Sequence, residues 1–553
     1  MKYKPYIIPA VLILFFVTAV CILCAVPPVA RDALTQHLYV PKLYLRHGGI
    51  YEIPRIEFSY YPMNLEMLYL VALYLGSDIL PAYIHFAFAL MTAFLIFRYL
   101  KNRLNLCFAL YGGMFFLSIP VIVKLSITAY VDLGLIFFTT FSLYWLFKWL
   151  ENSFRLRYLV ISAAGCGLAL GTKYNGLLVL FLLTLFIPFA YGNGSAERRR
   201  RFFKPLGFSV VFFLISLSVY SPWMIRDVIW KHNPVYPLYN SWFNPAVPAA
   251  VIGAEAGRNS HDLDHVPFNQ FLIRKYVYHE SWWQTLLIPL RVFFEGQDDQ
   301  PAHFDGRLSP LLFFLPFFGF FFIREKPEAV QFEMKLLLAF SVLYLLFAFA
   351  LTDMRIRYIA PIIPPLVILS IIGLHDLWRW IQSSASQIRK SWGTAVICTG
   401  IIAFSALHIS YLIRQFSIVQ PLPYIRGDIR RDAYITRYRP EFPAIEFINR
   451  HLPATAQILA LWLGDRGYYF DRKVFFALRL PEAVLDRSDS PESVALALHR
   501  MGISYILVRY DLMNDWLSRQ PDTHDKMMLM SFFQHNTRLI FSKLGHGVYE
   551  ILR

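Results

Sequence analysis

Charged side chains are scarce in this chain of 553 residues. Asp, Glu, Lys and Arg make up 16% of it and hydrophobic residues 57%, whereas soluble globular proteins have about 25% charged and about 45–50% apolar residues. This composition argues against intrinsic disorder, a fibrous repeat and an ordinary cytosolic enzyme. It favours a membrane protein, and the length allows many spans with a soluble domain left over.

Cysteine is also rare. The five cysteines all lie in apolar stretches, at Cys21, Cys24, Cys107, Cys166 and Cys398. Because none falls in a polar region, the sequence excludes a disulfide framework. Cys21 and Cys24 have a metal-like spacing, but they lack a second pair or a His partner, which indicates packing within a membrane span.

Long apolar runs are abundant. A span needs about 20 mostly apolar residues, and the runs predict about eleven spans, near residues 5–26, 81–98, 104–123, 133–150, 157–171, 175–191, 205–220, 308–323, 335–351, 358–374 and 393–413. The first run exceeds the apolar core of a signal peptide, so we expect an uncleaved span. Residues 63–75 are apolar but short and predict an interfacial or re-entrant helix. A twelfth span there is the alternative, and it would invert the later topology.

The net charge of +16 is concentrated in loops between these spans. With the N-terminus inside, every predicted cytoplasmic loop is short and basic, which is the arrangement that fixes orientation. The run Arg198–Arg201 is therefore interpreted as a topology determinant, and we expect no nucleic-acid partner. The same topology places residues 27–80, 221–307 and 414–553 outside.

The tail, residues 414–553, alternates apolar strands with amphipathic helices. Helices are predicted at Ile445–His451 and Pro491–Met501, and strands at Ile458–Leu463, Ile503–Val508 and Val548–Leu552. This alternation predicts a small α/β domain. It has no Gly-rich phosphate loop, and Gly464-Asp465-Arg466-Gly467 needs no more than a turn. The expected fold class is mainly α: a multi-pass membrane domain over residues 1–413, followed by a C-terminal α/β extracytoplasmic domain over residues 414–553.

The predicted spans are nearly free of charge, and polar residues gather at their outer ends. A transporter would place ionisable residues along a path through the membrane. His85 lies within a predicted span, and we expect its ring to be satisfied by packing. The distribution favours a reaction at the outer membrane–water boundary.

Two acidic residues mark this boundary. Asp32 follows the first predicted span and Asp132 precedes the fourth. A helix N-terminal cap is the alternative interpretation of each, because Asp before an apolar run accepts hydrogen bonds from backbone N–H groups.

Basic residues at the same outer ends break the positive-inside pattern. They are Lys173, Arg226 and Arg357. An anionic ligand such as a phosphate or diphosphate would account for them, because Arg offers a planar fork of donors and Lys a compact charge. Anionic lipid headgroups, or ion pairs with Asp227 and Asp353, are the alternatives.

In their order and outer placement these motifs resemble the GT-C fold glycosyltransferases, membrane enzymes that take sugar from a polyprenyl-phosphate carrier. The nearest subgroups are the lipid A aminoarabinose transferases and the protein O-mannosyltransferases. The resemblance covers about residues 1–410, and the matching motifs are Asp32, Asp132, Gly171-Thr172-Lys173-Tyr174-Asn175-Gly176, Pro222-Trp223-Met224-Ile225-Arg226, Asn233-Pro234-Val235-Tyr236-Pro237, Phe304-Asp305-Gly306-Arg307-Leu308-Ser309-Pro310, and Arg357-Tyr358 with Pro361 and Pro364.

The resemblance implies an inverting transfer, in which an acceptor hydroxyl attacks the anomeric carbon and the polyprenyl phosphate leaves. It implies Asp32 as the catalytic carboxylate. It also implies a set of residues that bind the donor phosphate or the substrate, namely Asp132, Lys173, Tyr174, Arg226, Arg357 and Tyr358.

The implied partners are a polyprenyl-phosphate sugar donor, membrane lipids, and a glycolipid, lipopolysaccharide or cell-envelope glycan as acceptor. The implied location is a bacterial inner membrane with the C-terminal domain in the periplasm. Some GT-C enzymes hold a divalent metal between two acidic loops. Because neither acidic site has an Asp-x-Asp motif, metal use stays open.

Three rival functions remain from the sequence. A transporter or flippase of lipid-linked substrates would lack the transfer step. A membrane assembly protein would use the outer domain to bind a partner without catalysis. A protein O-glycosyltransferase would act on protein in place of a glycan.

Overall fold

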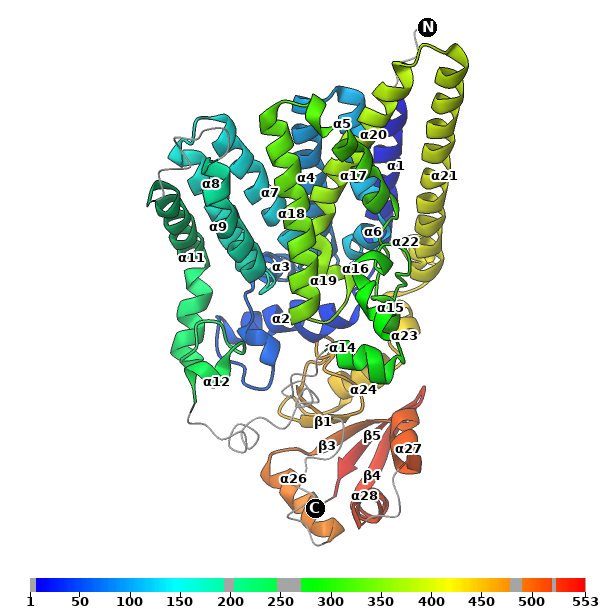
Figure 1. The fold of residues 1–553 in the computed structure, drawn as a ribbon. Helices are drawn as coiled ribbons and strands as arrows, with labels where there is room; N and C mark the ends of the chain where they lie inside the picture. Colours follow the sequence, from blue (N-terminus) through cyan, green and yellow to red (C-terminus); the bar gives the residue numbers. More distant parts are fainter. Residues whose placement is uncertain (1–5, 193–202, 246–269, 478–489, 520–523, 553) are drawn as a thin grey trace.

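The computed structural model describes residues 6–192, 203–245, 270–477, 490–519 and 524–552. The chain forms a bundle of apolar helices with a small α/β domain at one end, which we call the lower end after its place in Figure 1. The predicted topology determinant Arg198–Arg201 lies outside the described residues, and so does the stretch 246–269 of the predicted outer loop 221–307.

Every predicted apolar run contains a helix. The bundle helices are α1 (Ile7–Cys24), α4 (Leu80–Arg103), α5 (Leu106–Ser118), α6 (Pro120–Ser126), α7 (Asp132–Glu151), α8 (Leu156–Leu170), α9 (Gly176–Gly192), α11 (Phe203–Lys231), α17 (Leu311–Phe321), α18 (Glu328–Leu351), α19 (Ile356–Ile359), α20 (Ile363–Gln382) and α21 (Gln387–Val419). Turns η6 (Ile323–Glu325) and η7 (Ala360–Ile362) join neighbouring helices.

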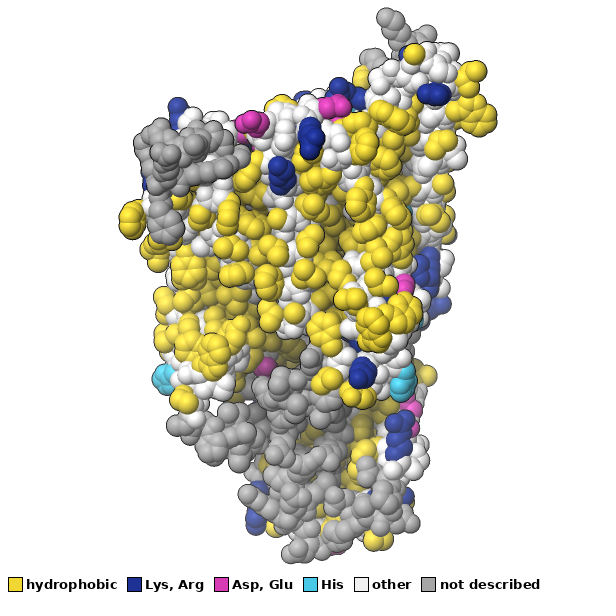
Figure 2. Space-filling view, viewed as in Figure 1, with side chains coloured by type: hydrophobic (Ala, Val, Ile, Leu, Met, Phe, Trp, Pro, Cys, Tyr) yellow, Lys and Arg dark blue, Asp and Glu magenta, His cyan; other side chains and the backbone are white. Residues whose placement is uncertain are grey.

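The helix lengths identify an integral membrane protein. Seven helical stretches among the described residues are long and apolar enough to cross a membrane, and α5 with α6, bent by 65°, makes an eighth if the pair is one span. Helices α8, α9 and α17 are apolar but shorter. The count of eleven spans therefore stays a prediction. Figure 2 shows a broad apolar surface on the visible face of the bundle, with Lys and Arg side chains at its upper end.

Glycines let some of these helices approach closely. A Cβ added at Gly373 of α20 would lie 1.9 Å from the carbonyl oxygen of Leu315 in α17. Any larger residue there would push the two helices apart, so the glycine fixes their separation.

Short helices cover the lower end of the bundle. Residues 27–80 form η1 (Ala33–His37), α2 (Tyr39–His47), η2 (Glu57–Tyr60) and α3 (Asn64–Tyr74). Helix α3 has 11 residues, too few to cross a bilayer, as predicted for residues 63–75.

The second large loop begins later than predicted, because α11 continues to Lys231 with Pro222 inside the helix and buries Arg226 and Asp227 at its end. The rest of this loop carries α12 (Asn240–Phe243), α14 (Gln270–Leu272), η4 (Ile273–Val277), α15 (Trp282–Leu286), α16 (Ile288–Arg291) and η5 (Pro301–His303).

The C-terminal domain is built on a five-stranded sheet of order β2-β1-β3-β5-β4. The strands are β1 (Gln457–Leu461), β2 (Lys473–Ala477), β3 (Tyr505–Arg509), β4 (Thr537–Lys543) and β5 (His546–Ile551), and the helices are α22 (Pro421–Ile425), α23 (Arg431–Tyr438), α24 (Phe442–His451), α26 (Pro491–Arg500), α27 (Tyr510–Arg519) and α28 (His524–His535). Strand β1 pairs in parallel with β2 and β3, while β5 is antiparallel to β3 and β4.

The predicted α/β domain is therefore present, and the five predicted elements match α24, β1, α26, β3 and β5. The sequence analysis missed the two edge strands. Strand β4 exposes most of its side chains, so it lacks the alternation of apolar and polar residues that predicts a half-buried strand.

Candidate active site at the lower end of the bundle

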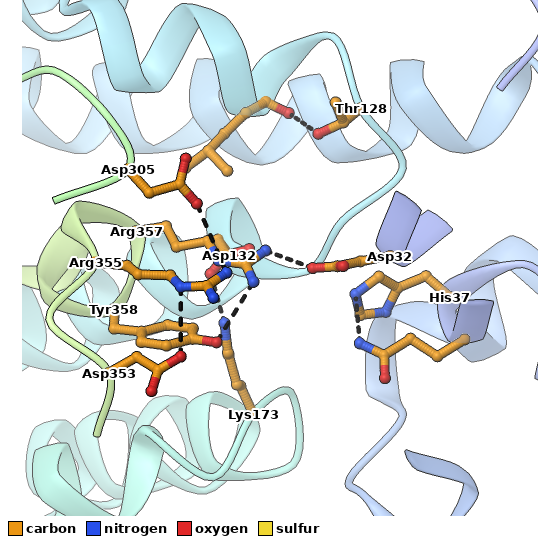
Figure 3. A network of polar contacts seen from close by, with 12 residues as sticks. Asp32, His37, Thr128, Asp132, Lys173, Asp305, Asp353, Arg355, Arg357 and Tyr358 are labelled. Atoms are coloured by element: carbon orange, nitrogen blue, oxygen red, sulfur yellow. Dashed lines mark hydrogen bonds and ion pairs between the residues drawn. The ribbon is translucent and has the colours of Figure 1, made fainter. Parts of the chain in front are cut away.

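A network of charged side chains lies at the lower end of the bundle, and Figure 3 shows it from close by. Asp32 directly precedes η1, Asp132 is the first residue of α7, Lys173 lies in the turn between α8 and α9, and Arg357 lies in α19. These four residues come from segments more than 300 positions apart, and the fold places their charged ends together.

Two ion pairs organise the network. The Arg357 guanidinium lies 2.5 Å from the Asp32 carboxylate, and the Lys173 ammonium lies 2.6 Å from the Asp132 carboxylate. The Asp132 side chain is 2% exposed, whereas those of Lys173, Arg357 and Asp32 are 19%, 16% and 25% exposed. Three of the four charged ends thus remain accessible to a ligand.

Neither carboxylate serves as a helix cap. Asp32 occupies the cap position of η1, and its side chain accepts no capping hydrogen bond. Asp132 lies inside the first turn of α7, after the cap residue Val131. The cap interpretation is therefore wrong for both residues, because each carboxylate is directed at a cation.

The tight turn before α9 positions Lys173. A Cβ at Gly176 would lie 2.5 Å from the Leu170 backbone, and one at Gly171 would lie 2.3 Å from the Asn64 amide nitrogen. The Asn64 N–H also donates to the Gly171 carbonyl at 2.9 Å. Gly171 lets the turn press against Asn64 of α3, and Gly176 lets it fold back on the end of α8. This turn carries Lys173 to Asp132.

Aromatic rings line the two cations. The Lys173 ammonium lies 4.7 Å from the centre of the Tyr358 ring, and the Arg357 guanidinium lies 5.1 Å from the same ring and 5.6 Å from that of Tyr130. Such rings attract cations and exclude water from one side of them. The sequence analysis included Tyr358 among the site residues and missed Tyr130.

Asp32 is ionised at neutral pH. Burial raises the pKa of its carboxyl group, but the charge of Arg357 and the hydrogen bond from it outweigh burial, and His37 and Lys173 add to their effect. The pKa of Asp32 therefore lies below its ordinary value of 3.8.

Arg226 and Tyr174 belong to a second cluster. The Arg226 guanidinium donates to the Asp227 carboxylate at 2.9 Å and to the carbonyl oxygens of Tyr60 and Tyr61. The Tyr174 hydroxyl donates to the Tyr236 carbonyl at 2.7 Å and contacts Asp227 at 3.3 Å. The pairing of Arg226 with Asp227, one of the alternatives left open by the sequence, is what the structure contains.

A buried pair beside Asp32 was missed altogether. The His37 Nδ1 lies 2.7 Å from the Glu66 carboxylate, and both side chains are almost fully buried. The His37 ring also lies 5.7 Å from that of Tyr130. No sequence motif marked Glu66, because it lies within the apolar stretch 63–75. His85, in contrast, is satisfied as expected by the Leu125 and Thr128 carbonyls and the Leu133 N–H.

The candidate site shows no cluster of metal ligands among the residues that the structure describes. Within the described ranges, no three His, Cys, Asp or Glu side chains gather into a group that could hold a metal ion. Asp32 and Asp132 each face a cationic side chain, so the charge of each carboxylate is already balanced by the protein.

Residues 62–225 match the family model described as dolichyl-phosphate-mannose-protein mannosyltransferase. The chain is similar in structure to ArnT from Cupriavidus metallidurans. The apo form gives a TM-score of 0.56 at 12% identity, covering 97% of both chains. The form bound to undecaprenyl phosphate gives 0.56 at 12% identity, covering 98% of this chain and 97% of that one.

A second relative is the archaeal oligosaccharyltransferase AglB from Archaeoglobus fulgidus, in complex with an inhibitory peptide and a dolichol-phosphate. It gives a TM-score of 0.51 at 12% identity, covering 91% of this chain and 70% of that one. A comparison with curated protein sequences gives no match. The chain therefore has the GT-C fold and is similar to the polyprenyl-phosphate-sugar-dependent glycosyltransferases.

Proposed function

We propose that this protein is a glycosyltransferase that moves a sugar from a polyprenyl-phosphate carrier to an acceptor hydroxyl at the outer face of a membrane, with inversion at the anomeric carbon. The observation that carries the proposal is the convergence of Asp32, Asp132, Lys173 and Arg357 at the lower end of the bundle. One ionised carboxylate and two cations meet the needs of a reaction that deprotonates a hydroxyl and releases a phosphate.

The cations suit the donor phosphate. Arg357 presents a planar fork of donors and Lys173 a compact charge, and both retain an accessible face. Among the described residues the buried Arg357 Nε has no hydrogen-bond partner, so a rotation of the guanidinium towards the phosphate would break no bond of this atom. Asp132 holds the Lys173 side chain in place, and the positive charge of Lys173 attracts the donor phosphate.

The transfer is one displacement. The acceptor oxygen forms a bond to the anomeric carbon, and the bond from that carbon to the phosphate oxygen breaks with its electron pair. The hydroxyl proton passes to Asp32, and the polyprenyl phosphate leaves as an anion held by Lys173 and Arg357. Asp32 is a weak base while Arg357 pairs with it. When Arg357 turns to the donor phosphate, Asp32 loses part of that stabilisation and becomes a stronger base.

The apolar helix bundle supports a proposal for how the protein and its donor lie in the membrane. The isoprenoid chain would stay in the bilayer while its phosphate reaches the network at the membrane–water boundary. Basic loops at the upper end support a cytoplasmic upper side. We accordingly assign the protein to a bacterial inner membrane, with the C-terminal domain in the periplasm and a glycolipid, lipopolysaccharide or cell-envelope glycan as acceptor.

Protein is the second candidate acceptor. The match of residues 62–225 to the mannosyltransferase model supports it, whereas the likeness to ArnT covers 97% of the chain. Offering the purified enzyme a labelled donor with either a glycolipid extract or a Ser/Thr-rich peptide distinguishes the two.

The test of the function uses purified protein and a labelled polyprenyl-phosphate sugar. We expect Asp32→Asn to lower the transfer rate by about 10²–10⁴-fold while the donor still binds. Lys173→Ala and Arg357→Ala should each weaken donor binding by about 10–100-fold, the effect of losing a hydrogen bond to a charged group.

The matched controls break a similar pair at the upper end. Lys326 and Asp376 form a buried ion pair of 2.7 Å, so Lys326→Ala and Asp376→Asn carry a comparable structural cost far from the site. Near wild-type transfer by Asp32→Asn rejects the base. Unchanged donor binding in both cation variants rejects the phosphate pocket.

A further inference from the structure

A loop of the C-terminal domain lies against the segment that carries Asp32. This docking loop, residues 464–471, follows β1. Its Tyr468 N–H donates to the Leu34 carbonyl at 3.1 Å, and its Tyr469 hydroxyl donates to the Pro28 carbonyl at 2.7 Å. The C-terminal domain therefore holds the backbone on both sides of Asp32.

Arg439 adds a third contact to the same segment. It lies directly after α23, and its guanidinium donates to the Val29 carbonyl. Residues 25–30 form no helix or strand of their own. The backbone just before Asp32 thus takes hydrogen bonds from another domain instead of from secondary structure.

Helix α2 also binds the docking loop through two basic side chains. The Lys42 ammonium donates to the Tyr468 and Phe470 carbonyls at 2.6 and 3.0 Å and lies 3.0 Å from the Asp471 carboxylate. Arg46 pairs with the same carboxylate. Figure 1 shows α2 lying across the lower end of the bundle, above the C-terminal domain.

The docking loop fits too closely to admit a side chain at its centre. A Cβ at Gly467 would lie 2.2 Å from the ring of Tyr39, which is 3% exposed. The sequence analysis found no more than a turn in Gly464–Gly467. The structure explains the glycine at position 467, because only a residue without a Cβ lets the docking loop approach α2 this closely.

This docking matters when the donor binds. In the structure the Asp32 side chain is held by Arg357, the cation that the proposed mechanism turns towards the donor phosphate. The carboxylate then depends on its backbone for its position. A misplacement of about 1 Å costs about 10²-fold in rate.

We propose that the C-terminal domain is a positioning element of the active site, in which the docking loop and Arg439 hold residues 28–34 so that Asp32 stays aligned with the acceptor hydroxyl while Arg357 engages the phosphate. This inference rests on the proposed transferase function. Arg439, Gly467 and Lys42 are positioning residues, and Asp32 remains the group that contacts the substrate.

The test compares two glycine variants of the full-length protein. Gly467→Ala forces the docking loop away from Tyr39, whereas Gly49→Ala, just after α2, places its Cβ where nothing lies within 4 Å. We expect Gly467→Ala to lower kcat at least about 10-fold and to speed hydrogen exchange at the Tyr468 amide, with donor affinity within about twofold of wild type. Gly49→Ala should change neither quantity.

A second pair of variants guards against misfolding of the first. Arg439→Gln removes the donor to Val29 and should lower kcat without weakening donor binding, and Arg439→Lys, which keeps a cationic donor, should restore part of the rate. If kcat stays at the Gly49→Ala value while exchange at Tyr468 rises, the docking does not position Asp32. If kcat and donor affinity fall together, the domain supports the whole pocket and the inference is equally wrong. Full activity of Asp32→Asn, by contrast, would reject Asp32 as the base, and only a wild-type protein that transfers no sugar from the labelled donor would overturn the proposed function itself.

Discussion

Asp132 is the most buried of the four charged residues Asp32, Asp132, Lys173 and Arg357, and removing its cation, Lys173, should be costly. In Lys173→Met the Asp132 carboxylate, 2% exposed, has no charge partner at 2.6 Å and no route to water. Removing one partner of a buried pair costs about 3–5 kcal/mol. We therefore expect Lys173→Met to lose that amount of unfolding free energy.

The exposures predict an asymmetry between the two partners. Lys173 is 19% exposed, so in Asp132→Asn its ammonium can turn towards water, and the loss should be about 1–2 kcal/mol smaller than in Lys173→Met. The double variant removes both charges and should recover at least about 1 kcal/mol relative to Lys173→Met, because no unpaired charge remains.

The measurement is unfolding of the four proteins in mixed micelles, followed by tryptophan fluorescence. Adding polyprenyl phosphate at about 100 times its dissociation constant should stabilise the wild type by about 2.7 kcal/mol, and Lys173→Met should gain far less at the same concentration. If Lys173→Met loses less than about 1 kcal/mol, the carboxylate is not confined as described. If it gains as much from the lipid as the wild type, Lys173 does not hold the phosphate.

Three further outcomes follow from the same contacts. Gly373→Ala should lower the unfolding free energy by about 1–3 kcal/mol or more, because its Cβ would meet the Leu315 carbonyl, whereas Gly400→Ala meets nothing within 4 Å and serves as the control in the same thermal melt. Burial and the charge of Arg46 lower the pKa of Lys42 to about 8 against the pull of Asp471. Between pH 8 and the ordinary pKa of 10.5, the unfolded chain therefore binds more protons than the folded one, so the unfolding free energy should rise with pH by an amount that Lys42→Met lacks. The lowered pKa of Asp32 in the donor-free protein predicts that kcat/KM for the donor, which reports the ionisation of the free enzyme, stays flat down to about pH 5. A decline in kcat/KM centred near pH 6 or above would contradict the assignment of Asp32 as the base.

Most of the architecture could be predicted from the sequence. Apolar runs of about 20 residues require membrane-spanning helices whatever their partners are, so each predicted run was found as a helix. The α/β character of the tail was also accessible, because its buried strands are short and apolar. The helix boundaries were less accessible. Helix α11 continues past its apolar run because Asp227 neutralises Arg226 within the fold, and no local pattern reveals that compensation.

The sequence could not predict which charged residues pair with one another. Asp32 and Arg357 are 325 positions apart, and the sequence placed them only at one level of the membrane. A shared depth in the membrane did not decide whether these charged side chains cap helices, bind lipid headgroups or form ion pairs with one another. The Gly467 contact was hidden for a related reason, since the ring that demands a glycine belongs to another domain.

Lys173 and Tyr174 show where this limit comes from. They are adjacent in one turn, yet Lys173 reaches Asp132 of α7 and Tyr174 reaches Asp227 of α11. Helix α8 packs against both of these helices, and a Cβ at its Gly167 would lie 2.5 Å from the Ser216 carbonyl of α11. That close approach brings α11 near the turn, so a second carboxylate comes within reach of the residue next to Lys173. A motif can thus state which polar residues stand at the boundary, whereas the packing of small residues tens of positions away decides which of them share a site.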